Sequence, residues 1–164
     1  MSKPLTSRFV NRVLHVLARS SPGATSIRPM LHRWRGVRIG KGVFIGDGVY
    51  LENEYPECVE IGDAVQISVR TIILAHTRGA GRIVIESGVY IGPNVVIACA
   101  GTRTLRIGAG AVIAAGCVIT SDVPPSVLMS NEPPRPIAEV RTSLATSDSF
   151  DDFVRGLRPI RKKS

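Results

Sequence analysis

Large aliphatic side chains recur in the middle of the chain at intervals of six residues. Four triplets keep this interval, with steps of ten, twelve and ten residues between triplets: Ile39, Ile45, Leu51; Ile61, Ile67, Ile73; Ile85, Ile91, Ile97; Ile107, Ile113, Ile119. A second row of mostly apolar residues lies two positions earlier, from Val37 to Cys117. Because residues two apart share one face of a strand, each hexad predicts a short strand with two inward side chains. Three strands close one triangular coil, so the pattern predicts an all-β, parallel solenoid of about four coils.

The longer steps always follow the third strand of a coil. The inserted segments are roughly residues 52–57, 76–81 and 99–104. In a stacked solenoid, these three loops lie above one another at a single corner. Loops held by a rigid scaffold are where such folds place binding surfaces, so this corner is the candidate functional site.

Several motifs accompany the repeat. Five hexads read VRIGKG, VFIGDG, VEIGDA, VYIGPN and LRIGAG, and two further segments are ILAHT at 73–77 and AVIAAGCVITSDVPPSVLMSNEPPRPIAEV at 111–140. With these motifs, residues 37–140 resemble the hexapeptide-repeat acyltransferases, in particular the sugar and antibiotic O-acetyltransferases. The resemblance implies a left-handed parallel β-helix, whereas spacing alone predicts only a coil.

His76 is the candidate catalytic base, because it is the one histidine within the repeat and lies at the inserted corner. In the family, a histidine in this setting takes the proton of an acceptor hydroxyl that attacks the thioester of acetyl-CoA. Imidazole suits this role because it titrates near neutral pH. Asn53 matches a position near the acceptor or the oxyanion in related enzymes, and it is the second predicted catalytic residue. Glu52 or Glu54 could instead orient the imidazole, although each could equally be a solvated loop residue.

The resemblance also implies a homotrimer that binds acetyl-CoA in the groove between neighbouring subunits. The positions that match cofactor-binding residues of the family are Tyr90, Ala115, Gly116, Thr120 and Arg135. Ser121, Ala138 and Thr77 depart from the family pattern, and the first two weaken the expected nucleotide end of the site. The loop after His76 is shorter than in small-sugar enzymes, which favours an open site for a bulky acceptor.

The two ends of the chain lie outside the repeat. Residues 5–19 predict an amphipathic helix with Leu5, Phe9, Val10, Val13, Leu14 and Leu17 on its apolar face. This helix could cap the open end of the β-helix, lie on a membrane surface as a peripheral contact, or contact a partner. Phe150, Phe153, Val154 and Leu157 predict a short C-terminal helix. The expected organisation is an N-terminal helix and linker (1–36), the β-helix domain (37–128) and a C-terminal extension (129–164).

Charge and cysteine content narrow the function. The net charge is +8, but residues 1–38 and 153–164 hold eight and five basic residues without an acidic one, so the remaining body is acidic overall. With no recognised nucleic-acid motif, no nucleic-acid partner is expected. Three cysteines without CxxC spacing predict neither a disulfide framework nor a zinc site. We expect a cytoplasmic protein without a signal peptide, at most peripheral to the inner membrane face.

The sequence therefore predicts an acetyl-CoA-dependent O-acetyltransferase that acts on a sugar-like acceptor, such as a surface polysaccharide or a glycolipid. N-acetylation of an amino sugar and a non-catalytic β-helix scaffold remain as alternatives. A γ-carbonic-anhydrase-like metal site needs three histidine ligands, and only His76 lies in the repeat, so no metal is expected.

Overall fold

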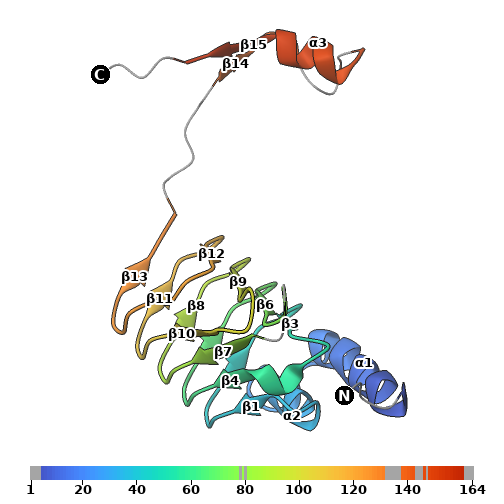
Figure 1. Ribbon diagram of the computed structural model, residues 1–164, viewed down its shortest axis with the longest axis vertical. Coiled ribbons are helices and arrows are strands. Elements are labelled where there is room, and N and C mark those ends of the chain that lie inside the picture. Colours follow the sequence, from blue (N-terminus) through green and yellow to red (C-terminus); the bar gives the residue numbers. More distant parts are fainter. Residues whose placement is uncertain are drawn as a thin grey trace. The chain divides into compact units, whose positions relative to one another are not determined.

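The computed structural model describes residues 5–77, 79, 81–131, 138–142, 146 and 148–160. The chain divides into two compact units, residues 1–131 and 132–164. The first unit is a solenoid of short parallel strands that wind around a triangular core, with two helices at one end (Figure 1).

Three parallel sheets form the sides of the solenoid in the described residues. The first sheet holds β1 (Arg38–Ile39), β4 (Val59–Ile61), β7 (Arg82–Ile85) and β10 (Thr104–Ile107). The second holds β2 (Phe44–Ile45), β5 (Gln66–Ile67), β8 (Tyr90–Ile91), β11 (Val112–Ile113) and β13 (Leu128–Met129). The third holds β3 (Tyr50–Leu51), β6 (Ile72–Leu74), β9 (Val96–Ala98) and β12 (Val118–Ile119). Consecutive strands thus belong to different sheets, which is the topology of a parallel β-helix.

The predicted aliphatic rows form the core. Ile45 pairs with Ile67 and Ile67 with Ile91, so one side chain stacks on the next along the solenoid axis. Except for the partly buried Ile39, every residue of the first row is 5% exposed or less, and the second row from Val37 to Cys117 is buried as well. The four-coil solenoid predicted from the spacing is confirmed.

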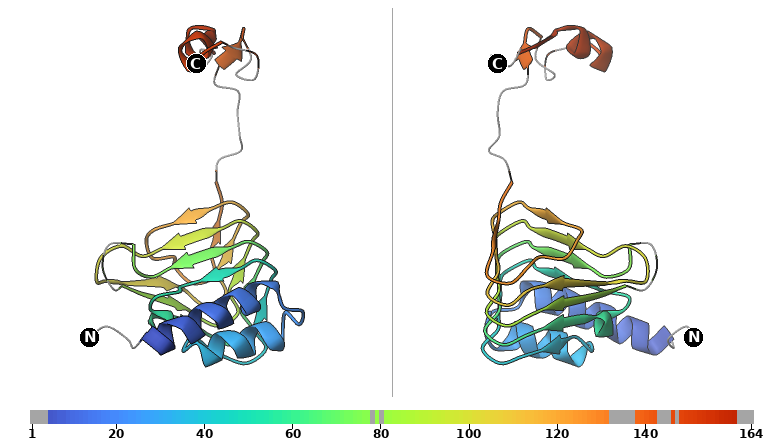
Figure 2. Two further views of the ribbon diagram at one scale, coloured as in Figure 1. Left: turned by 90° about the vertical axis from the view of Figure 1, so that its right-hand side faces the viewer. Right: turned by 60° about the vertical axis from the view of Figure 1, so that its left-hand side comes forward.

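Two helices close the end of the solenoid that begins with β1, β2 and β3. α1 (Leu5–Ser20) and α2 (Ile27–Trp34) lie side by side across this end (Figure 2). Carbonyl groups of the first coil have no further strand to pair with, and arginines of α2 and its C-terminus supply donors instead. Each of the three strands receives one arginine: Arg33 donates to Ile39 and Gly40, Arg28 to Ile45, and Arg35 to Leu51 and Glu52.

α1 covers the end of the solenoid mainly with its polar side. The side chains that α1 turns toward the body are Asn11, Leu14, His15 and Ala18, whereas most of its large apolar side chains are exposed. The helix therefore lies where a cap was expected, but its apolar face points away from the core. The physical reason is that the end of the solenoid offers unpaired backbone carbonyls, which need polar partners such as the Asn11 amide on Asn53.

The second unit has its own small topology. β14 (Ala138–Val140) pairs antiparallel with β15 (Leu157–Pro159), and α3 (Phe150–Arg155) lies between them in the chain. Ser149 caps α3, because its hydroxyl accepts a hydrogen bond from the Asp152 amide at 3.1 Å. The predicted short C-terminal helix is confirmed over Phe150–Arg155, whereas Leu157 was expected in it but begins β15. Within the described ranges, every helix is too short or too polar to cross a bilayer.

Candidate active site

The three inserted loops stack at the corner between the third and the first sheet. They follow β3, β6 and β9, and the first contains a short 3₁₀-helix, η1 (Pro56–Cys58). Leu51 pairs with Ile73, so the chain leaves the core at equivalent points in the first two coils (Figure 2). This register brings Glu52 of the first loop beside Ala75 and His76 of the second.

Glu52 and His76 form a hydrogen-bonded pair at this corner. The Glu52 side chain is fully buried, and its Oε2 lies 2.6 Å from Nδ1 of His76. Oε2 also accepts the amide of Ala75 at 2.8 Å, and Oε1 accepts the amides of Glu54 and Tyr55 at 2.8 and 3.2 Å. Both carboxylate oxygens are thus held by donors that belong to two adjacent coils.

These contacts decide the charge of Glu52. Burial alone would raise the pKa of the carboxyl group, but the hydrogen bonds from His76, Ala75, Tyr55 and Glu54 outweigh it and lower the pKa. Glu52 is therefore ionised at neutral pH. A carboxylate can only accept hydrogen bonds, so Nδ1 of His76 must carry the proton between them. In the neutral imidazole, Nε2 is then the free base, which is the tautomer that a general base needs.

The His76 imidazole contacts the Tyr55 ring and is partly exposed to solvent. The Tyr55 ring meets the His76 ring edge-on, with 5.7 Å between ring centroids. The His76 side chain remains 34% exposed, although its partner Glu52 is buried. The imidazole is therefore fixed on one side and open to a reactant on the other.

Arg35 supports the first loop from beneath. Its guanidinium donates to the carbonyl of Glu52 at 2.7 Å and to Oδ1 of Asn11 at 2.9 Å. Nη1 lies 2.8 Å from Nδ1 of the buried His32, and since arginine only donates, this nitrogen accepts. Burial lowers the pKa of Arg35 to about 10, with Tyr50 and Glu52 opposing the shift, so Arg35 stays cationic at neutral pH.

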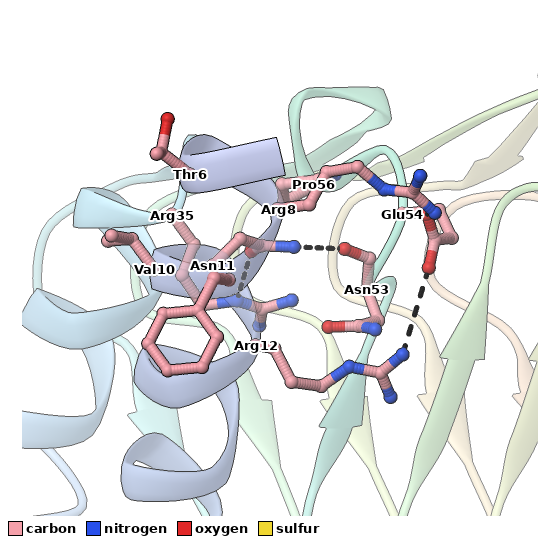
Figure 3. Close-up of a pocket in the computed structure, with 10 residues that line it drawn as sticks. Thr6, Arg8, Val10, Asn11, Arg12, Arg35, Asn53, Glu54 and Pro56 are labelled. Carbon is pink, nitrogen blue, oxygen red and sulfur yellow. Dashed lines mark hydrogen bonds and ion pairs between the residues drawn. The ribbon is translucent and has the colours of Figure 1, made fainter. Parts of the chain in front are cut away.

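Asn53 lies in a different position from His76. Its side chain continues the inward alternation of Val49 and Leu51 and is 4% exposed. It lines a pocket of about 760 Å³ between α1, Arg35 and residues 53–56 (Figure 3). Within the described part of the chain, Oδ1 of Asn53 has no hydrogen-bond partner. A buried carbonyl oxygen of this kind is available to a ligand that donates a hydrogen bond.

Four of the predicted cofactor-binding residues, Tyr90, Ala115, Gly116 and Thr120, lie on other parts of the solenoid. Tyr90 projects from the second sheet, half exposed, with the Ser68 hydroxyl at 3.4 Å from its own. Ala115 and Gly116 are exposed at the turn between β11 and β12, and Gly92 beneath them has no room for a side chain, because a Cβ would lie 2.7 Å from the Ala115 amide. The Thr120 carbonyl, above the corner loops, accepts from Arg103. Arg135 lies outside the described residues.

Sequence reasoning assigned no role to Arg35 or Tyr55 and left Glu52 as one of two alternatives. The sequence spacing does point to Glu52. Equivalent residues of the first and second coils are 22 positions apart, as for Leu51 and Ile73, so Glu52 lies beside Leu74 and next to Ala75. Arg35 and Tyr55 lie outside the repeat and carry no such signal. No group of three metal-ligating side chains is found among the described residues.

The comparisons with known proteins identify the fold and support one family. No protein-family model matches the chain. YvoF from Bacillus subtilis (strain 168), a candidate acetyltransferase, is 27% identical over 137 residues, which cover 80% of this chain and 77% of YvoF. The hexapeptide-repeat containing acetyltransferase VCA0836 from Vibrio cholerae aligns with a TM-score of 0.54 and 27% identity, over 75% of this chain and 84% of that one. These similarities and the β-solenoid support a hexapeptide-repeat acyltransferase family for this chain.

Two further comparisons concern one enzyme of similar sequence and one solved structure of similar fold. A 2,3,4,5-tetrahydropyridine-2,6-dicarboxylate N-acetyltransferase from Staphylococcus aureus (strain JH9) is 32% identical over 49% of this chain, but the match spans only 31% of that enzyme. A galactoside acetyltransferase in complex with coenzyme A shares the fold, with a TM-score of 0.54 and 19% identity over 75% of each chain. The left-handed parallel β-helix predicted from the motifs is confirmed, and the named relatives support an acetyltransferase activity.

Proposed function

We propose that this hexapeptide-repeat acetyltransferase moves the acetyl group of acetyl-CoA to a hydroxyl of a sugar-like acceptor, with His76 as the general base. The observation that carries the proposal is the Glu52–His76 pair. A buried carboxylate, held by three backbone amides, fixes the tautomer of an imidazole whose other side is exposed. A structural histidine would need no such support.

The proton moves along a short path at His76. Nε2 accepts the proton of the acceptor hydroxyl as the oxygen forms its bond to the acetyl carbon. The imidazolium is stabilised by the Glu52 carboxylate at Nδ1. When the carbon–sulfur bond breaks, Nε2 returns the proton to the departing thiolate, so His76 ends the cycle neutral. A thioester is already activated, and general-base help of about 10²–10⁴-fold suffices without a covalent enzyme intermediate.

Acetyl-CoA is proposed to bind along Tyr90, Ala115, Gly116, Thr120 and Arg135. Support comes from the exposed small residues Ala115 and Gly116, which let a chain-like ligand approach the backbone. The galactoside acetyltransferase with the same fold was solved with coenzyme A. Arginine binds phosphate oxygens in pairs, which suits Arg135 to the nucleotide end.

The pocket that Asn53 lines is proposed to hold a part of the acceptor away from its reacting hydroxyl, which lies at Nε2 of His76. Its volume of about 760 Å³ lies within the usual range of small-molecule sites. A sugar hydroxyl that donates to Oδ1 of Asn53 would satisfy this buried oxygen. We therefore favour a polyhydroxylated acceptor, with a hydroxyl rather than an amine as the acetylated group.

The active unit is proposed to be a homotrimer in the cytoplasm. Tyr90 and His76 lie on different sides of one solenoid, so a cofactor that touches both must lie between two subunits. The outward residues of the second and third sheets are also partly apolar: Phe44, Tyr90, Val112, Leu128, Ile72 and Val118. The first sheet instead carries an ion-pair ladder of Arg38, Glu60 and Arg82, which suits it to solvent.

Isothermal titration of acetyl-CoA into the wild-type protein and into His76→Ala tests the proposal together with a thiol-release assay on a panel of sugars. We expect binding at about one site per chain in both proteins, and turnover that falls about 10²–10⁴-fold in His76→Ala. Thr102→Ala changes an exposed residue of the neighbouring corner loop and is the matched control for both measurements.

The outcomes separate the alternatives. Equal turnover in His76→Ala and wild type would overturn the role of His76. Turnover with amino sugars but not with sugars that lack the amine would favour N-acetylation. Absence of acetyl-CoA binding in a folded protein would overturn the transferase proposal and favour a scaffold.

A further inference from the structure

The outer face of α1 is apolar along its length. Phe9 is 70% exposed, and Val10, Val13, Val16 and Leu17 are exposed as well. These residues lie opposite the face that packs on the solenoid through Asn11, His15 and Ala18. Contiguous exposed apolar surface of this kind on a folded protein marks a site of interaction.

α2 extends this surface. Its exposed large side chains are Ile27, Met30 and Trp34, of which Trp34 is 65% exposed. Val10 and Leu14 of α1 line a shallow hollow together with Trp34, so the apolar residues of the two helices are neighbours. We call the exposed residues Phe9, Val10, Val13, Leu17 and Trp34 the outer helical face.

The chain segment that forms this face carries charges of one sign. Residues 1–46 contain no Asp or Glu, and the first acidic residue is Asp47. Arg8 and Arg12 flank α1 on the side of the corner loop, and both reach the same carboxylate, that of Glu54 (Figure 3). Their side chains remain more than half exposed. Arg19 lies on the same flank, over the Tyr50 ring.

This charge pattern decides between the possible occupants. Two copies of the face packed on each other would bring arginines of α1 against arginines of α1, with no acidic residue in the segment to compensate. An anionic lipid surface complements the arginines and accepts the apolar side chains below its headgroups. Aromatic residues such as Trp34 and Phe9 are favoured at that depth.

We propose that the outer helical face docks on an anionic membrane surface, with Phe9, Val13 and Trp34 in the interfacial layer and the α1 arginines at the level of the headgroups. The helices lie in the plane of the interface and do not cross it. Phe9 also lines the pocket proposed for the acceptor, so docking is measured as vesicle binding without acetyl-CoA or acceptor, a readout that does not depend on the reaction.

Co-sedimentation with vesicles tests this directly. The full chain is mixed with vesicles of phosphatidylcholine alone or with an equal share of phosphatidylglycerol. We expect binding to the anionic vesicles only, and a decrease as salt rises from about 0.1 M to about 1 M, where the screening length falls from about 10 Å to about 3 Å. Phe9→Ser and Trp34→Ser should each weaken binding about 10-fold or more, as expected for removing a buried aromatic side chain.

Phe150→Ser is the matched control, because Phe150 is equally exposed but lies in the C-terminal unit. Its binding should equal that of the wild type. Binding that falls with salt but is unchanged in Phe9→Ser and Trp34→Ser would mean that charge alone is responsible, and would overturn the proposal. No binding to anionic vesicles would overturn it too. Self-association in sedimentation velocity that Phe9→Ser abolishes would assign the face to a second copy.

Discussion

At the scale of single residues, Glu52 determines what His76 can do. Its two oxygens accept hydrogen bonds from both coils of the corner, with the amides of Glu54 and Tyr55 on one oxygen and the Ala75 amide and His76 on the other. Because all of these partners are donors, only an ionised carboxylate satisfies them together. The same contacts therefore stabilise the loop and select the tautomer of the base.

Glu52→Gln tests both roles with almost no change in volume. The amide has only one oxygen, so its NH₂ group must face either the two loop amides or the Ala75 and His76 pair. We expect a loss of about 2 kcal/mol in the free energy of unfolding from the unpaired donors, measured by urea denaturation. Turnover should fall by about 10²-fold or more where the NH₂ group imposes the wrong tautomer on His76.

Glu57→Gln is the control, since Glu57 is an exposed acidic residue of the same corner loop. It should change stability and turnover little. A Glu52→Gln protein as stable and as active as Glu57→Gln would contradict the assignment.

The sequence could predict His76 but could not choose between its acidic neighbours. Glu52 and Glu54 are separated by one residue, so both point to the same side of the chain at that stage. Burial separates them, because Glu52 is fully buried beneath the loop whereas Glu54 reaches the arginines of α1. That difference depends on the path of the loop after β3, where the six-residue repeat is interrupted and gives no register.

At the scale of elements, the junction of α1 and α2 with the solenoid contains two buried, neutral histidines. His15 meets the Tyr50 ring edge-on at 4.6 Å between centroids, and His32 is fully buried beside Arg35. Burial, followed by the charge of Arg35, lowers the pKa of His15 to about 4 and that of His32 to about 3. Both rings are therefore uncharged in the folded protein near neutral pH.

This junction should weaken in acid. The unfolded chain takes up protons on its histidines below their ordinary pKa of 6.5, while the folded chain resists until about 4 and about 3. The free energy of unfolding is therefore highest above pH 6.5, and it decreases as the pH falls toward the pKa values of the two histidines in the folded protein. Between pH 7 and pH 5 we expect a loss on the order of 2 kcal/mol for each histidine, measured by urea unfolding.

His15→Phe should remove the part of this pH dependence that comes from His15, which is about half of the loss expected for the two histidines together. Phenylalanine keeps the edge contact with Tyr50 and removes a buried ring whose nitrogens have no partner in the described structure. We also expect it to raise stability at neutral pH, since no unpaired polar atom remains. If the free energy of unfolding falls equally between pH 7 and pH 5 in the wild type and in His15→Phe, the titration of His15 does not contribute to the pH dependence.

The helical pattern of α1 was predictable, but its orientation was not. Periodicity reports which residues share a face and says nothing of which face meets the body. The usual assumption is that apolar residues turn inward. Here the body presents the carbonyl of Asn53 and the buried side chain of Arg35, and Asn11 bonds to both. Backbone groups at the end of a solenoid are invisible in a hydropathy pattern.

At the scale of the whole molecule, the three sides of the solenoid differ in chemistry. The first sheet carries alternating charges, and the second and third carry exposed apolar residues. The proposed trimer follows from this difference, because each subunit can bury its apolar sides against its neighbours and leave the charged side to solvent.

Val118→Glu tests the trimer from the third sheet. Val118 is 65% exposed in the single chain, so a folded monomer tolerates the charge, whereas an apolar interface does not. Sedimentation velocity should change from three chains of 17.6 kDa to a single chain, with loss of turnover. Thr104→Glu on the first sheet is the matched control and should leave the mass unchanged. A wild-type protein that sediments as a monomer would contradict the trimer.

The arginine cap on the first coil has a consequence for how long the stack can grow. A parallel solenoid has no intrinsic length, since each coil presents to the next the same row of carbonyls and aliphatic side chains that it receives. Arg28, Arg33 and Arg35 occupy the carbonyls of β2, β1 and β3 in turn, with planar groups that cannot serve as a further coil. A chain shortened to begin at Val37 would offer three bare strand edges to the next molecule, and end-to-end polymerisation into fibrils would be the natural fate of such a fragment.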